Sequence, residues 1–214
     1  MFDNFNLREW ILEALYRIPG ILIGLSFHEW AHAYAAYKRG DPTARNLGRM
    51  TVNPIAHLDP IGIVMLLVAG FGWARPVPVN PRNFKEPRKD EIIVSLAGVT
   101  TNLIIAFVFM GIAYLVSLFT QSEVAYVLLL YTVYINVGLF VFNLIPVPPL
   151  DGYHVFQALF ARHIGYRFFQ AFERYGNYIL IAIVLGGGGI LTAAIGGVVG
   201  LIDGFYTMLF GLFI

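Results

Sequence analysis

The chain has 214 residues, of which 58% are hydrophobic and 13% charged, with a formal net charge of +1 and no cysteine. A soluble domain carries about 25% charged residues, so this chain has too few to cover a water-facing surface, and a lipid bilayer is its expected solvent. The small net charge gives no basic field for nucleic acid. The lack of cysteine excludes disulfides, thiolate metal sites and a cysteine nucleophile.

The first 38 residues contain two helical patterns. Residues 5–18 carry apolar and charged side chains on different faces at helical spacing, which predicts a helix lying at the membrane interface. Pro19 and Gly20 are expected to end it, although the segment could equally be the water-facing end of the next helix. Residues 21–37 form the first apolar span, which stops at Lys38 and is short for a bilayer.

A second apolar run, residues 61–73, is shorter still. A helix needs about 17–25 apolar residues to cross a bilayer, so this run is expected to enter the membrane and return. Residues 74–82 follow as a predicted short β-strand or loop. Valine and proline alternate in residues 76–81, and a free strand edge there could pair with an extended substrate; an ordinary extended linker is the alternative.

The rest of the chain is mostly apolar. Residues 92–119 and 124–145 are each long enough to span a bilayer, and residues 153–175 have an amphipathic pattern. Residues 176–214 are interpreted as two short spans, with one tilted span and a tail as the alternative. The predicted fold class is an all-α polytopic membrane protein with five or six membrane segments, one of them re-entrant, in a single domain over residues 1–214.

Positive charge is concentrated in three segments. Twelve of the 14 Lys and Arg residues lie in residues 38–49, 75–89 and 162–174. Basic segments beside short spans stay in the cytoplasm, and all three can do so only if residues 61–73 re-enter instead of crossing. This distribution predicts a multi-pass protein of the cell membrane, with these segments in the cytoplasm and the N-terminal helix on the outer face.

The strongest functional signal in the first span is His28-Glu29-Trp30-Ala31-His32. Histidines at positions i and i+4 share one face of a helix and can bind one zinc ion, while Glu29 is placed to act as general base on the attacking water. Ionisable residues inside a membrane helix are costly and usually functional. A bound dication compensates for them; the alternative is a polar helix end with hydrogen-bonded histidines.

A catalytic zinc site needs a third protein ligand. Asp59 and Asp151 both lie at the edge of apolar segments on the expected cytoplasmic side, and Asp151 is the better candidate. It follows a proline-rich stretch that cannot sustain a helix, and irregular backbone at membrane depth lines protein or water-filled cavities. Gly152 then allows close backbone approach. Asp151 could also cap the following helix, a role compatible with metal binding.

Together these motifs resemble the site-2 protease family of intramembrane zinc metalloproteases. The resemblance rests on HEWAH in the first span and on NLIPVPPLDG at residues 143–152. Residues 53–62 and 72–81 are also similar to the compact bacterial and archaeal branch of that family. The similarity covers roughly residues 20–160, the expected catalytic core.

The family implies His28, His32 and Asp151 as ligands of one Zn²⁺ per chain and Glu29 as the base. It also implies that Asn143 steadies the substrate or the developing oxyanion; a helix–helix hydrogen bond is the alternative. The implied reaction is hydrolysis of a peptide bond within or near a transmembrane helix of a membrane-protein substrate, in a site that opens toward the cytoplasm. Some relatives carry PDZ or CBS domains, and none is expected here.

Two rival functions use the same His and Asp cluster. A membrane metal transporter would need polar residues along a path to the far side, and the outer half of residues 92–145 offers little beyond Thr, Ser and Tyr. A non-catalytic scaffold would have no need of an intact HExxH motif.

Three further polar residues have open roles. His57 fits a structural role better than ligation, and His154 could orient the aspartate or lie on a helix surface. Asn102 could support the site, although its segment departs from the family pattern at Val99, where proline is common.

Overall fold

The computed structural model describes residues 6–69 and 73–211, and the expected all-α class is confirmed in this part of the chain. No β-strand forms among these residues, and two short 3-10 turns, Pro54–Ala56 and Pro81–Asn83, lie in the loops. The α-helices are α1 (Leu7–Lys38), α2 (Thr43–Asn46), α3 (Pro60–Ala69), α4 (Pro87–Phe119), α5 (Glu123–Asn143), α6 (Asp151–Ile164), α7 (Tyr166–Gly186) and α8 (Gly188–Gly211).

Among the described residues, four helices are long and apolar enough to cross a membrane: α1, α4, α5 and α8. Large apolar side chains stay exposed on them, such as Leu115 of α4 at 45% and Leu201 of α8 at 77%. A bilayer accommodates such a surface and water does not. Since α3 has only ten residues, the expected total of five or six membrane segments stays a prediction.

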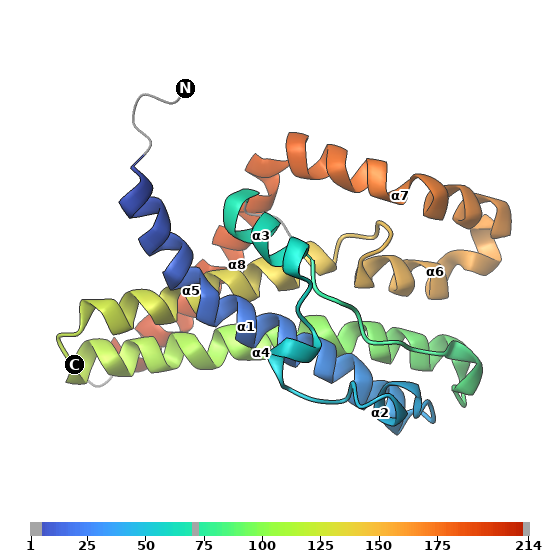
Figure 1. Ribbon diagram of the computed structural model, residues 1–214, viewed down its shortest axis with the longest axis horizontal. Helices are drawn as coiled ribbons and strands as arrows, with labels where there is room; N and C mark the ends of the chain where they lie inside the picture. Colours follow the sequence, from blue (N-terminus) through green and yellow to red (C-terminus); the bar gives the residue numbers. More distant parts are fainter. Residues whose placement is uncertain (1–5, 70–72, 212–214) are drawn as a thin grey trace.

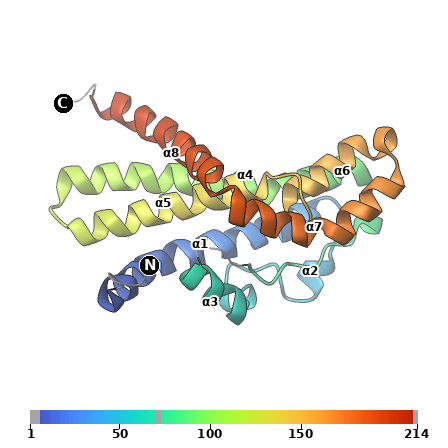
Figure 2. The same cartoon turned by 90° about the horizontal axis from the view of Figure 1, so that it is seen from above.

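The central antiparallel pair is α4 and α5, joined by a turn at residues 120–122 (Figure 1). α1 packs on one side of this pair and α8 on the other (Figure 2). On the α8 side the core is apolar, with Ala106, Val133 and Val137 fully buried near Tyr206. The polar site described below lies on the α1 side.

α1 is one continuous helix that contains Pro19, so the expected break after residue 18 is wrong and the segment is the first part of the next helix. Its position relative to the membrane surface stays a prediction. Gly20 is buried against α5, where an added Cβ would lie 2.9 Å from the Cα of Thr132. This packing holds the helix together across a residue that lacks an N–H. The helix bends in its first half (Figure 1), as proline in a helix commonly causes.

The apolar run at residues 61–73 returns to the level at which it begins. α3 occupies most of it, residues 70–72 lie outside the described residues, and Leu58 forms an antiparallel bridge with Ala74. The N–H of Arg75 also donates to the carbonyl of His57 at 2.7 Å. This closed geometry agrees with a re-entrant segment and disagrees with a full crossing.

Residues 74–82 form an extended loop, and the expected short strand reduces to the single bridge at Ala74. Three prolines in this stretch have no N–H to donate to a ladder. The loop crosses beside α1 and ends in the 3-10 turn at residues 81–83.

The C-terminal region contains two helices, α7 and α8, and whether residues 176–214 cross the membrane once or twice stays a prediction. Gly165, with φ of +92°, separates α6 from α7, so the amphipathic pattern of residues 153–175 covers parts of two helices. Gly187 then separates α7 from α8. Only α8 meets the length and composition of a span, and residues 212–214 lie outside the described residues.

All three basic segments lie at one end of the molecule. α2, the turn at residues 81–83 and the α6–α7 connection gather there, opposite the α4–α5 turn (Figure 1). This is the arrangement that a re-entrant α3 requires, although the side of the membrane on which this end lies stays a prediction.

Candidate metal centre

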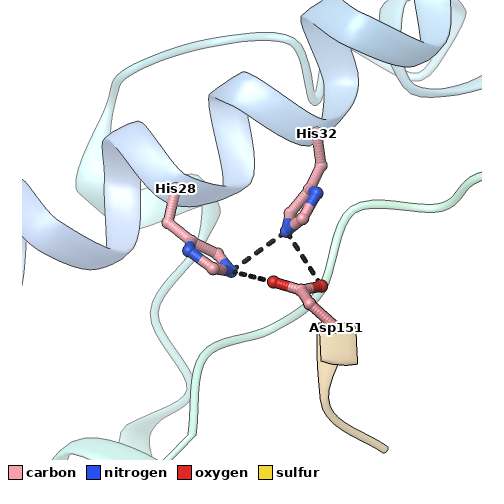
Figure 3. A group of neighbouring side chains, drawn as sticks. All are labelled: His28, His32 and Asp151. Atoms are coloured by element: carbon pink, nitrogen blue, oxygen red, sulfur yellow. Dashed lines mark hydrogen bonds and ion pairs between the residues drawn. The ribbon is translucent and has the colours of Figure 1, made fainter. Parts of the chain in front are cut away.

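The two histidines of the HEWAH motif lie one turn apart on α1, and both are buried. Their Nε2 atoms are 3.0 Å apart. Asp151, at the start of α6, brings Oδ2 to 3.3 Å from Nε2 of His28 and Oδ1 to 3.3 Å from Nε2 of His32 (Figure 3). The predicted cluster therefore forms, and its ligand atoms all lie within 4.8 Å of one another.

The other nitrogen of each imidazole is held by α4. Nδ1 of His28 lies 2.6 Å from Oδ1 of Asn102, and Nδ1 of His32 lies 2.8 Å from the carbonyl of Val94. Both partners are acceptors, because the Asn102 amide nitrogen donates to the Gly24 carbonyl and to Oδ1 of Asn136. Each Nδ1 therefore carries a proton, and in the neutral imidazole this leaves the Nε2 lone pair facing the carboxylate.

This arrangement fits a cation. With both imidazoles neutral, two Nε2 lone pairs and a carboxylate converge on one point, and Oδ2 of Asp151 is buried without a hydrogen-bond partner among the described residues. Buried acceptors of this kind need a proton or a metal ion to offset their desolvation. Two imidazoles and one carboxylate form a zinc ligand set that leaves a fourth position open.

Two glycines let backbone approach the cluster closely. An added Cβ on Gly98 of α4 would lie 2.4 Å from Nε2 of His32, so the helix passes directly beside the imidazoles. An added Cβ on Gly152 would lie 2.4 Å from the carbonyl oxygen of Leu144, which explains how α6 starts so close to the end of α5. Asp151 makes no capping hydrogen bond; Leu150 holds the N-cap position.

Glu29 is buried beside the cluster and contacts the extended loop. Its Oε2 accepts a hydrogen bond from the N–H of Val77 at 2.7 Å. The loop is anchored further along, where the N–H of Asn80 and the side-chain amide of Asn83 donate to the Asp41 carboxylate at 2.7 and 2.8 Å. The end of α1 thus fixes the loop that holds Glu29.

The Asp41 carboxyl lies between α1 and α2 and is 1% exposed. Burial would raise its pKa, but hydrogen bonds from Thr43, Asn80 and Asn83 outweigh burial and hold the pKa below its usual value of 3.8. The carboxylate is therefore charged at neutral pH and part of the fixed architecture of the loop.

A cavity of about 350 Å³ opens next to the metal centre. Its walls are the two histidines, Glu29 and Asp151, the loop of residues 76–81, and side chains of α4 and α6. Asn143 also lines it, and its amide donates to the carbonyl of Leu139 at 3.0 Å. One N–H of that amide is thus used within α5, and its proposed role stays a prediction.

The remaining histidines lie apart from the cluster. His57 is fully buried and Nε2 donates to the carbonyl of Thr51 at 2.6 Å, which fits the expected structural role. His154 lines the cavity together with Asp151, and its Nδ1 lies 3.7 Å from Oε1 of Glu91 on α4.

Sequence reasoning left out several partners of the site. Asn102 was a candidate and proves to hold His28, whereas Asn136 was overlooked. A polar residue within an apolar span was the signal that could have found it. No sequence signal points to backbone partners such as the Val94 carbonyl and the Val77 N–H.

Comparison with known proteins supports the resemblance to the site-2 protease family. The profile of peptidase family M50 matches residues 117–187. "Putative zinc metalloprotease YwhC" of Bacillus subtilis is 42% identical over 174 residues, which are 78% of this chain and 79% of that protein. A protein of the same description called Rip2, from Mycolicibacterium smegmatis, is 32% identical over 143 residues, 64% of this chain and 54% of that protein. No solved structure matches this sequence.

Proposed function

Because this chain belongs to the M50 peptidases, the site-2 protease family of zinc metalloproteases, we propose that it hydrolyses a peptide bond within or near a transmembrane helix of a membrane-protein substrate. The observation that carries the proposal is the convergence of His28, His32 and Asp151 beside a buried Glu29 in a helical membrane bundle. One Zn²⁺ per chain is the expected cofactor.

The four residues have distinct roles. His28, His32 and Asp151 would hold the zinc, which would supply a Lewis acid to polarise the scissile carbonyl and to lower the pKa of the attacking water. Glu29 takes the proton of that water as general base and delivers it to the leaving amine. Its bond from the Val77 N–H keeps one carboxylate oxygen in place, and Glu29 lines the cavity.

Asn143 is proposed to steady the substrate carbonyl. It lines the same cavity at the end of α5, with one amide hydrogen committed to Leu139. The second amide hydrogen has the chemistry to donate to the developing oxyanion.

The cavity is proposed to open to the cytoplasm. His28 precedes Lys38, the last residue of α1, by ten positions, which is about 15 Å along a helix. The surrounding end of the molecule carries the basic segments that are retained in the cytoplasm. Water can thus reach a site below the membrane surface from that side.

The loop of residues 76–81 is proposed to hold the substrate in an extended form, since a helical segment hides its peptide bonds. Residues 77 and 79 have their backbone polar groups on one edge of an extended chain, and their proline neighbours carry no N–H. The Val77 N–H already donates to Glu29, so pairing would use the other backbone groups of these two residues. The loop lines the cavity beside Glu29, so a paired segment would lie next to the metal centre.

Metal analysis and cleavage together test the proposal. Purified wild-type protein is expected to contain one zinc per chain, which Asp151→Ala loses or binds weakly. Glu29→Gln is expected to keep zinc and lower cleavage of a membrane-protein substrate by about 10²–10⁴-fold. Undiminished cleavage by the Glu29→Gln variant would show that Glu29 is not the general base. Metal flux across the membrane in place of cleavage would indicate a transporter.

A further inference from the structure

The more exposed part of the cavity lining, here called its mouth and containing Glu91 and His154, has a carboxylate that the proposed reaction does not use. Glu91 lies in the first part of α4 and lines the cavity, with its side chain 27% exposed. It faces the half-exposed imidazole of His154 across 3.7 Å. The other two carboxylates of the cavity are engaged, because Asp151 faces the histidines and Glu29 accepts the Val77 N–H.

The charges around Glu91 leave it available to a cation. In the described part of the chain no Lys or Arg lines this cavity, while Glu29, Glu91 and Asp151 do. A bound Zn²⁺ would offset the charges of Glu29 and Asp151, which leaves the negative charge of Glu91 at the mouth. His154 is the neighbouring group, and a surface-exposed imidazole is a weak and replaceable partner for a carboxylate.

The wall beside Glu91 is apolar. Phe84 and Val94, each 6% exposed, pack together there and line the cavity with it. Lysine and arginine side chains bury their aliphatic stems along apolar surface and place the charged head beyond it. The mouth thus offers an apolar wall for the aliphatic stem of a long basic side chain and a carboxylate for its charged head.

We propose that Glu91 is a specificity-determining residue that binds a lysine or arginine of the substrate on the cytoplasmic flank of its transmembrane helix. This inference rests on the proposed function and names a feature of its substrates. Membrane proteins carry an excess of Lys and Arg on cytoplasmic flanks, so the charge of the cavity mouth complements this class of partner. In the absence of substrate, the imidazole of His154 is the neighbour of the Glu91 carboxylate.

The spacing along α4 fixes the register of this contact. Glu91 precedes Gly98 by seven residues, about 10 Å along a helix, and Gly98 lies directly beside the two imidazoles. An extended peptide advances about 3.3 Å per residue. The basic side chain is therefore placed about three residues from the scissile bond.

Peptide binding tests the inference separately from catalysis. The probe is a fluorescent single-span peptide with lysine on its cytoplasmic flank, and matched peptides carry glutamine or glutamate there. Zinc-loaded Glu29→Gln protein in detergent micelles is expected to bind the lysine peptide about tenfold more tightly than the glutamate peptide. When Glu91→Lys is combined with Glu29→Gln, the protein should bind the glutamate peptide more tightly than the lysine peptide. When Glu91→Gln is combined with Glu29→Gln, the two peptides should bind equally.

Glu86→Lys is the matched control, since Glu86 lies five residues earlier, is exposed and pairs with Lys89 outside the cavity. It should leave the order of binding unchanged, and equal zinc content in every variant shows that the fold is kept. The inference is overturned if the Glu29→Gln protein binds all peptides equally or binds none of them. It is also overturned if Glu91→Lys does not change the order of peptide affinities. If wild-type protein contains zinc and cleaves its substrate, the proposed function survives that result.

Discussion

The two halves of α4 differ in what they bury. The first half buries polar groups, among them Ser95 and Asn102, and faces the histidines of α1. The second half packs Ala106 and Met110 against α5 and α8, and Ala113 is also buried there. One helix thus supports a directed polar network near the expected cytoplasmic end and an apolar packing surface at the other end. Buried polarity marks the functional half, because it is costly and persists only where partners are fixed.

The largest effect is expected from filling the space beside the histidines. Gly98→Ala places a Cβ where the imidazole of His32 now lies, so both ligands must move, and zinc affinity should fall by more than about 100-fold. Zinc titration measures this. Gly200→Ala on α8, where an added Cβ meets nothing within 4 Å, is the matched control. Unchanged affinity in Gly98→Ala would contradict the close approach.

The second prediction compares the two halves of α4 directly. Asn102→Ala removes the acceptor for Nδ1 of His28 and should weaken zinc binding by about 10–100-fold. Met110→Ala, in the apolar half, should leave zinc affinity unchanged and lower the free energy of unfolding by about 2–5 kcal/mol through a cavity. Zinc titration and unfolding in detergent separate the two. Equal zinc affinities in the two variants would show that the polar half of α4 does not support the metal centre more than the apolar half does.

A smaller effect is expected at the loop that contacts Glu29. Val77→Pro removes the N–H that donates to the carboxylate, so Glu29 loses a positioning contact and kcat should fall about tenfold with zinc retained. Val77→Ala keeps the N–H and should keep kcat. The two variants are compared by cleavage rate and metal content, and equal kcat values would show that the bond does not position the base.

The smallest effect concerns pH. The folded pKa of Asp41 is below its usual 3.8, so its stabilisation is complete above pH 3.8 and is lost as pH falls through the folded value. The melting temperature in detergent should therefore fall by about 3 °C more in wild type than in Asp41→Asn across this range. If the melting temperatures of the two proteins change equally with pH, this carboxylate does not anchor the loop.

The site could be predicted from sequence where chemistry is local. A helical spacing of four residues places His28 and His32 on one face whatever surrounds them, and the proline-rich stretch before Asp151 signals irregular backbone. The spans at residues 92–119 and 124–145 follow from length and hydropathy alone; α4 covers the first, and α5 covers the second up to Asn143. These features depend on the chain's own periodicity and composition.

Tertiary structure decided what the local pattern left open. Pro19 signals a helix end by itself, yet α1 continues because α5 packs against Gly20. The tautomers of the histidines depend on Asn102 and the Val94 carbonyl, which lie more than 60 residues away. Sequence names the candidate ligands, because residue type determines what an atom can bind. Only packing determines which backbone and amide atoms lie close enough to orient them.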